Sequence, residues 1–299
     1  MTKDKLKTVA AQIGISEIGV SRAEPFDDLW KTLKNSRKMQ PPSSFEEYEL
    51  EKRCDPSMFL PGAKSIVVCL FPYYSKHIQP DNLSRYSCVR DYHIVVMEKL
   101  EQLAGFLRRE ISCSCKCASD NWPLADRYLA HRAGLGFYGR NRMLINRRFG
   151  SYFFIGSIVT DAELDPDVPL ENTCLQCGKC AEACPGGALR ADAFDYNKCI
   201  SYLTQAKELS HEQTVLLGSQ KKIYGCDVCQ EVCPHNYALP DTAMEEFLDG
   251  YIEHLPEDDI LFLSNREFLK KYREYPFSWR GRKVLARNLQ QKELDKIRD

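Results

Sequence analysis

Apolar side chains recur at helical spacing in three stretches of the first half of the chain. The longest is DYHIVVMEKLEQLAGFLRREI, residues 91–111, which has an aspartate near its start. Shorter helices are predicted at 3–13 and at 123–133. The last of these ends in GLGFYGRN (134–141). Its three glycines predict a backbone that approaches something closely, because glycine has no side chain and tolerates positive φ.

A different pattern predicts the strands. KSIVVCLF (64–71) is continuously apolar and rich in β-branched residues after a Pro-Gly turn, which predicts a buried strand. Further strands are predicted at Ile18–Val20, 142–146 and 151–160. Taken together, the pattern predicts an α+β protein with three parts: an α/β domain over residues 1–165, a cysteine-rich domain over 166–240 and a mostly helical segment over 241–299.

Length and charge exclude several classes of protein. The chain has 299 residues, enough for two domains, and a net charge of −1, so any surface for nucleic acid must be local. The longest strongly apolar run covers about seven residues, far short of a membrane span. The N-terminal MTKDKLKTVAAQIG predicts an amphipathic helix and lacks the apolar core of a signal peptide. We therefore expect a cytoplasmic protein with no membrane partner.

Cysteine is the residue that points to chemistry. There are 14 cysteines, and eight of them lie between Cys174 and Cys233, which in a reducing compartment indicates metal or redox chemistry rather than disulfides. The first group has the C-x2-C-x2-C-x3-C-P spacing of a bacterial two-cluster ferredoxin, in which the fourth cysteine binds the other cluster. This spacing assigns the ligands of the first cluster to Cys174, Cys177, Cys180 and, from the second group, Cys233.

The second group, Cys226, Cys229 and Cys233 before a proline, lacks one cysteine of that pattern. Cys199 is the other cysteine of this region and is assigned as the missing ligand, so that 26 residues separate it from Cys226. The second cluster would then take Cys184, Cys199, Cys226 and Cys229. Paired structural zinc sites are the alternative, but three ligands on one tight loop suit tetrahedral zinc poorly.

The remaining six cysteines carry weaker signals. Cys54, Cys69 and Cys88 are isolated in the sequence and are expected to be small buried apolar residues. The cysteines of SCSCKC (112–117) alternate, which places Cys113, Cys115 and Cys117 on one face of a strand. A metal role for these three stays open, although their spacing is not that of a zinc hook.

With the cysteines laid out, the chain resembles the epoxyqueuosine reductase (QueG) family. The likeness runs from about residue 5 to 290 and depends on several stretches in one order. They are EKRCDPSMFLPGAKS (51–65), SRYSCVRDYH (84–93), SDNWPLADRYLAHRAGLGFYGRN (119–141), FGSYFFIGSIVTDAELDPD (149–167), the first cysteine group, CISYLT (199–204) and IYGCDVCQEVCPHN (223–236).

The resemblance implies two [4Fe–4S] clusters and a base-off cobalamin bound by the N-terminal domain. It implies reduction of epoxyqueuosine to queuosine in the tRNA anticodon, the last step of queuosine biosynthesis. A low-potential donor such as a flavodoxin or ferredoxin would supply the electrons. A positioned acid would protonate the departing oxygen, and help of this kind is worth about 10²–10⁴ in rate. Two other functions are weighed against this one: a corrinoid reductase of another substrate and a ferredoxin-type electron carrier.

The resemblance also implies site residues. Asp120 in Ser119-Asp120-Asn121-Trp122-Pro123 matches the family's acid, although Asn and Trp stand where small residues are usual, which leaves the shape of the pocket in question. The alternative is that Asp120 caps the helix that follows. Cobalamin contacts are expected from Asp120 and from four other residues, namely Arg53, His93, Asn141 and Ser201. The cobalamin motif D-x-H-x-x-G is absent, in agreement with a base-off mode.

Contacts with tRNA are expected from basic residues. Arg132 and Arg140 flank the glycine-rich stretch and either meet substrate phosphate or are solvated surface residues. Segment 269–287 carries seven Lys/Arg and one acid. We expect it to bind phosphate in a salt-dependent way, and the alternative is a solvated basic helical surface. Many family members continue into HEAT-like repeats after such a stretch, so the chain resembles a short form without them.

Overall fold

The computed structural model describes residues 3–190 and 193–296. Residues 1–2, 191–192 and 297–299, which the predicted three-part division includes, lie outside the described residues. The chain forms two compact units. Unit 1 comprises residues 1–72, 93–139 and 143–174, and unit 2 comprises residues 73–92, 140–142 and 175–299. The predicted boundaries at 165 and 240 stay a prediction.

Unit 1 is built on a four-stranded sheet in the order β1-β2-β6-β3, in which every neighbouring pair is antiparallel. The strands are β1 (Glu17–Arg22), β2 (Ser65–Pro72), β3 (Cys115–Ala118) and β6 (Phe153–Thr160). Val68 of β2 lies opposite Ser157 of β6, which in turn lies opposite Ala118 of β3. The predicted strands at 18–20, 64–71 and 151–160 are therefore confirmed.

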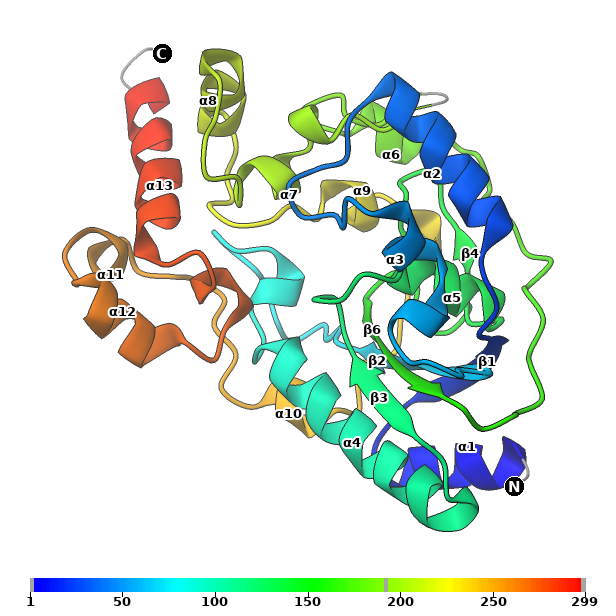
Figure 1. Cartoon of the computed structure of the whole chain (residues 1–299). Coiled ribbons are helices and arrows are strands. Elements are labelled where there is room, and N and C mark those ends of the chain that lie inside the picture. Colours follow the sequence, from blue (N-terminus) through cyan, green and yellow to red (C-terminus); the bar gives the residue numbers. More distant parts are fainter. Residues whose placement is uncertain (1–2, 191–192, 297–299) are drawn as a thin grey trace. The chain divides into compact units, whose positions relative to one another are not determined.

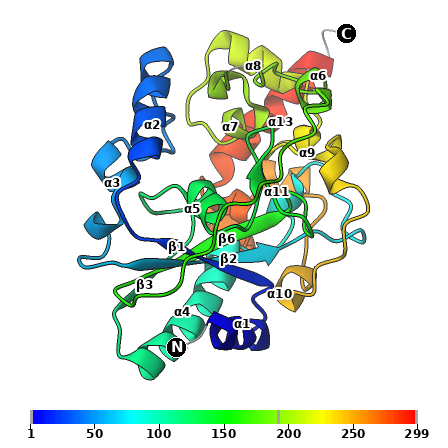
Figure 2. The same cartoon turned by 90° about the vertical axis from the view of Figure 1, so that its right-hand side faces the viewer.

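Strand β2 lies inside the sheet and is buried along its whole length, as its unbroken apolar sequence predicts. Ile66, Val68 and Leu70 point into a core formed with α5 (Asp126–Arg132). The opposite face meets α4 (Tyr92–Ile111), and Figure 2 shows α4 and α5 on opposite sides of the sheet. Helix α4 approaches β6 most closely at Gly156, where an added Cβ would lie 2.5 Å from Val96 Cγ1.

The other elements of unit 1 surround this sheet (Figure 1). The helix predicted at 123–133 begins only at Asp126. The close approach expected of the glycine-rich stretch is made to another segment of the same chain. A Cβ on Gly134, at φ +71°, would lie 2.5 Å from the Val168 carbonyl oxygen. The remaining elements are α1 (Lys3–Gln12), α2 (Asp27–Met39), α3 (Leu50–Cys54), the 3-10 turn η1 (Pro56–Met58) and the hairpin β4 (Phe137–Tyr138) and β5 (Leu144–Ile145).

Unit 2 is made of short helices. Helix α6 packs against α9, and α8 packs against α13. Arg287 and Asn288 of α13 donate hydrogen bonds to the carbonyl oxygens of Leu203 and Thr204 at 3.2 and 2.8 Å. The helices are α6 (Lys179–Glu182), α7 (Ile200–Leu203), α8 (His211–Gly218), α9 (Val228–Glu231), α10 (Glu245–Leu248), α11 (Glu257–Leu261), α12 (Asn265–Tyr272) and α13 (Arg282–Lys296), with 3-10 turns η2 (Arg85–Ser87), η3 (Tyr196–Lys198), η4 (Pro234–Asn236) and η5 (Pro276–Ser278).

Among the described residues, no helix has both the length and the apolar character that a membrane crossing requires.

The approach of α4 to Gly156 gives a prediction for stability. In Gly156→Ala the new methyl group would overlap Val96 and Leu100 of α4, and overpacking of this kind destabilises a protein by about 1–3 kcal/mol. We expect Tm, measured by circular dichroism under anaerobic conditions, to fall by several degrees. Gly105→Ala on α4 is the control, because its Cβ would meet nothing closer than Arg109 Nη1 at 3.5 Å. An equal Tm for Gly156→Ala and the wild type would contradict this account of the packing.

Candidate active site and cysteine cluster

The candidate acid Asp120 lies on a tight loop that joins β3 to α5. The loop begins where the Ser119 hydroxyl donates to the Ile155 carbonyl oxygen of β6 at 3.0 Å. Asp120 has a left-handed backbone, φ +60°, which aspartate tolerates better than most residues. The backbone N–H of Trp122 donates to the Asp120 carbonyl oxygen at 2.8 Å and closes the turn. The turn leaves the Asp120 side chain 61% exposed.

His93 is the second residue of α4, and its Nε2 lies 3.6 Å from Asp120 Oδ2. This separation is longer than a hydrogen bond but allows an ion pair when the imidazole is protonated. The predicted residues His93 and Asp120, which are 27 positions apart in the sequence, are thus brought together. A carboxyl beside an imidazole is a pair that can carry and transfer a proton.

The alternative role of Asp120 as a helix cap is wrong. Helix α5 begins at Asp126, and Ala125 occupies the capping position without a side-chain cap. The predicted start at 123 is too early because residues 119–123 belong to the loop. One turn of that loop is stabilised by the indole of Trp122, whose Nε1 donates to Asp126 Oδ1 at 2.7 Å.

Asp126 is a site residue that the sequence analysis missed. Burial, and then the charge of Asp120, raise the pKa of its carboxyl to about 7, against the opposing effects of the Trp122 N–H and Arg53. A pKa of about 7 places the change of charge of this carboxyl in the neutral range. The signal in the sequence was only an acid six residues after Asp120, within the helix predicted at 123–133.

Arg53, predicted to contact cobalamin, positions the same loop. Its Nη1 donates to the Pro123 carbonyl oxygen at 3.1 Å, and its Nε lies 3.3 Å from Glu46 Oε1. Arg132, one of the two candidate phosphate ligands, pairs with Glu24 at 2.8 Å and stacks on Phe26. Both guanidinium groups thus have structural partners within unit 1.

In unit 2 the structure brings four predicted ligands near one another. Burial is the largest cause that raises the pKa of the Cys226 thiol to about 12, and Cys199 and Cys184 also raise it. The pKa of the Cys229 thiol is raised by burial and then by Cys226, Cys199, Cys184 and Cys180. Electrostatic influence of this kind acts over short distances, so these four thiols are neighbours in the fold.

Two further residues fix the backbone beside these thiols. The Asn141 amide donates to the Cys229 carbonyl oxygen at 3.2 Å, so this predicted cobalamin contact lies next to a predicted cluster ligand. Asp227, between Cys226 and Cys229, is buried and accepts the backbone N–H of Arg85 at 2.7 Å. Ser201 follows Cys199 on α7, and its carbonyl oxygen accepts the Thr204 hydroxyl at 3.0 Å.

The six cysteines outside this region fall into a buried group and a half-buried group. Cys54, Cys69 and Cys88 are buried, and burial raises the pKa of each thiol. The sulfur atoms of Cys113 and Cys115 lie 3.6 Å apart at the start of β3. Within the described part of the chain, no three His, Cys, Asp or Glu side chains are arranged as a ready site for a single metal ion.

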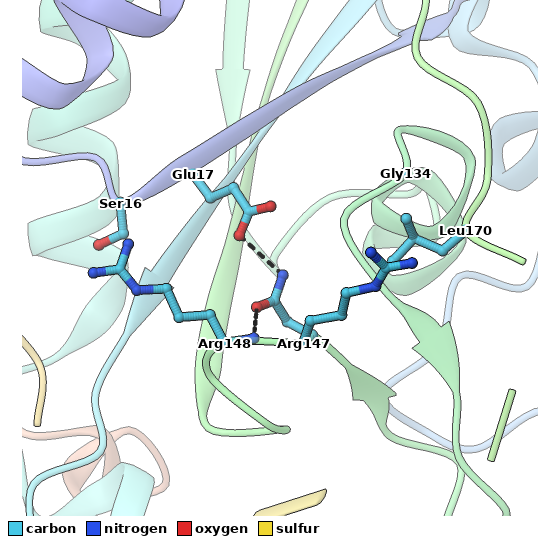
Figure 3. Close-up of a pocket in the computed structure, with 7 residues that line it drawn as sticks. Ser16, Glu17, Gly134, Arg147, Arg148 and Leu170 are labelled. Atoms are coloured by element: carbon cyan, nitrogen blue, oxygen red, sulfur yellow. Dashed lines mark hydrogen bonds between the residues drawn. The ribbon is translucent and has the colours of Figure 1, made fainter. Parts of the chain in front are cut away.

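A pocket of about 340 Å³ opens in unit 1 near the start of β1. Figure 3 shows Glu17 at its centre, with Arg147 and Arg148 reaching to either side. Burial raises the pKa of Glu17, while a hydrogen bond from Asn146 at 3.0 Å lowers it. None of the residues predicted for the site lines this pocket.

Two family models match the chain. The model "Epoxyqueuosine reductase QueG, DUF1730" matches residues 53–121, and the "4Fe-4S double cluster binding domain" matches residues 173–236. The first segment contains Arg53, His93 and Asp120, and the second contains all eight predicted cluster ligands.

Curated proteins and solved structures are similar over nearly the whole chain. The epoxyqueuosine reductase of Bacillus cereus is 38% identical over 92% of this chain and 76% of its own length. A crystal structure of epoxyqueuosine reductase with an epoxyqueuosine-modified tRNA-Tyr stem loop has a TM-score of 0.89 and 36% identity, covering 97% of this chain and 80% of that one. A Bacillus subtilis structure, whose catalytic aspartate loop is swung out of the active site, has a TM-score of 0.85, with the same identity and coverage.

These likenesses confirm the predicted α+β fold, in which a mixed domain is joined to a ferredoxin-like double-cluster domain and a helical C-terminal segment.

The pKa of Asp126 gives a prediction on pH. Its carboxyl should be protonated below about pH 7 and ionised above it, whereas an ordinary aspartate ionises near pH 4. Infrared difference spectra of the wild type against Asp126→Asn should show a protonated carboxyl band that disappears with a midpoint near pH 7. A midpoint below about pH 5 would show that burial and Asp120 do not perturb this group.

Proposed function

Because the chain belongs to the epoxyqueuosine reductase family, whose members are oxidoreductases, we propose that it reduces epoxyqueuosine to queuosine in the anticodon of tRNA. The observation that carries this proposal is the match to relatives over both functional segments, 53–121 and 173–236. The predicted family and enzyme class are thus confirmed. The tRNA stem loop bound by the similar solved enzyme supports the choice of substrate.

The proposed reaction removes one oxygen atom. Both C–O bonds of the epoxide break, a C=C bond forms, and the oxygen leaves as water after taking up two electrons and two protons. An alkoxide is a poor leaving group, so a proton delivered to the oxygen as the first C–O bond breaks lowers the barrier. This step needs an acid at a defined position beside the epoxide.

Asp120 is the proposed acid. Its carboxyl is exposed enough to meet a large substrate, and it lies on a loop, as does the catalytic aspartate of the Bacillus subtilis relative. His93 Nε2, 3.6 Å away, is placed to return a proton to the carboxyl after turnover. In this scheme Asp120 touches the reacting oxygen and His93 acts through Asp120.

Eight cysteines are proposed to hold two [4Fe–4S] clusters. The set matches the donor chemistry of such clusters, which thiolates bind. One cluster would take Cys174, Cys177, Cys180 and Cys233, and the other Cys184, Cys199, Cys226 and Cys229. The electrostatic effects of Cys184 and Cys199 on Cys226 and Cys229 support the nearness of the last four thiols, and Cys180 of the other proposed set also influences Cys229. When bound, the clusters supply one-electron transfer, and the raised thiol pKa values mean that binding releases protons.

Base-off cobalamin is the proposed partner of the clusters, and when bound it supplies a strongly reducing cobalt centre for removal of the epoxide oxygen. In unit 1, His93 and Asp120 are the predicted contacts that lie together and would face such a cofactor, with His93 Nε2 3.6 Å from Asp120 Oδ2. Arg53 fits less well as a direct contact, since Pro123 and Glu46 engage its guanidinium. Asn141 and Ser201, which belong to unit 2, stay predicted contacts.

The remaining proposals concern partners and location. Segment 269–287 is the proposed phosphate-binding surface, and its exposed basic residues are Lys270, Lys271, Arg273 and Lys283. Lys271 pairs with Asp259 at 2.6 Å. Arg287 of the same segment serves the fold instead, through its bonds to the α7 end. A low-potential flavodoxin or ferredoxin is the proposed electron donor, and the cytoplasm the proposed location.

The role of Asp120 can be tested by Asp120→Asn. Asparagine also tolerates a left-handed backbone, so the loop should keep its shape while the acid is lost. We expect turnover of epoxyqueuosine-containing tRNA, followed by mass spectrometry of the released nucleosides, to fall about 10²-fold or more, with iron content unchanged. Near-normal turnover in this variant would remove Asp120 as the acid.

The role of Cys199 can be tested by iron analysis. In Cys199→Ala the second cluster would lose one of four thiolates, so we expect anaerobically reconstituted protein to bind about half the iron of the wild type and to lose one of two cluster signals in EPR. Cys88→Ala is the control, because Cys88 is buried in the same unit outside the predicted ligand set. A full two-cluster spectrum in Cys199→Ala would exclude Cys199 as a ligand.

A further inference from the structure

We propose that Trp122 and Asp126 are positioning residues for the Asp120 loop: their side chains tie the loop to α5 and keep the Asp120 carboxyl beside His93. This inference rests on the proposed function, since it concerns the same proton donor. Neither residue needs to touch the substrate, and both act through Asp120.

The Trp122 side chain makes two contacts with elements outside the loop. Its Nε1–H donates to Asp126 Oδ1 at 2.7 Å, a short distance for this type of bond. The face of the indole meets Phe59 edge to face, with ring centroids 5.0 Å apart and ring planes at 71°. One residue of the loop is therefore attached both to the start of α5 and to the segment that follows η1.

The loop has two other fixed points, one on each side of residues 120–122. Ser119 is held upstream through the Ile155 carbonyl, and Pro123 is held downstream through Arg53. Between them Asp120 has a left-handed backbone, which costs energy in any residue with a Cβ. Trp122 adds a side-chain attachment to the backbone bonds of this turn, which run from the Asn121 N–H to the Ser119 carbonyl oxygen and from the Trp122 N–H to the Asp120 carbonyl oxygen.

Asp126 suits the role of acceptor for a second reason. Its carboxyl is engaged by Trp122 and influenced by Arg53, Arg127 and Asp120, so charges from the loop, α3 and α5 meet at this one group. An acid that is displaced by about 1 Å can lose 10²-fold in rate, so the attachment bears directly on catalysis. Trp122 and Asp126 thus set where Asp120 stands, and Asp120 performs the chemistry.

Hydrogen–deuterium exchange of the reconstituted protein tests the attachment without reference to activity. Trp122→Phe keeps an aromatic ring at this position and removes the donor, while Asp126→Leu removes the acceptor together with the charge of the carboxyl. In both we expect peptides that cover residues 119–125 to exchange about tenfold faster than in the wild type. Asp126→Asn keeps an acceptor oxygen and should retain the slow exchange. Trp30→Phe, on α2 of the same unit, is the matched control and should leave these peptides unchanged.

Turnover then tests positioning. We expect kcat on epoxyqueuosine-containing tRNA to fall about tenfold in Trp122→Phe and Asp126→Leu while KM stays within twofold, with Asp126→Asn close to the wild type. Exchange that is unchanged in both Trp122→Phe and Asp126→Leu would overturn the proposal, as would faster exchange with unchanged kcat. If the wild type itself reduces no epoxyqueuosine, the proposed function fails, whereas faster exchange in the two variants would still support the attachment.

Discussion

The contact between α4 and the sheet at Gly156 is the constraint on which unit 1 depends. A helix that carries Val96 and Leu100 can reach β6 only where the strand has no side chain. His93 stands in the first turn of the helix that packs there. Strand β3 pairs with the same β6 and delivers the loop of Asp120. The pair of His93 Nε2 and Asp120 Oδ2, 3.6 Å apart, is thus brought together by two elements that pack on one strand.

Sequence reasoning predicted the parts of the molecule whose signals are local. The unbroken apolar run of β2, the apolar spacing of α4 and the spacing of Cys174 to Cys184 each lie within one short stretch. Trp122 and Asp126 show why the rest escaped. Trp122 raised only a question about pocket shape, because its partners Phe59 and Asp126 become neighbours through the fold. The pKa of Asp126 is a product of burial and of a charge on another element, and neither can be seen in a sequence pattern.

In the cysteine region, the sequence predicted the ligands but not the residues that anchor them. The missing ligand of the second group was assigned to Cys199 by elimination, and the fold places its thiol near those of Cys184, Cys226 and Cys229. The residues between Cys199 and Cys226 form α7 and α8, so the separation in sequence is filled by folded structure. Asp227 was overlooked because an acid between two cysteines has no pattern of its own. Its burial and its bond to the Arg85 backbone anchor the Cys226–Cys229 loop to η2.

The bonds from α13 to α7 have a consequence beyond stability. Arg287 and Asn288 engage the carbonyl oxygens of Leu203 and Thr204, at the end of the short helix whose first residue follows Cys199. The same stretch of chain that contains Arg287 is the proposed surface for phosphate. The proposed iron ligand Cys199 and the proposed phosphate surface are thus joined through one short helix. If binding at one of them shifts the bonds between α13 and α7, reciprocity requires the other to respond by the same free energy.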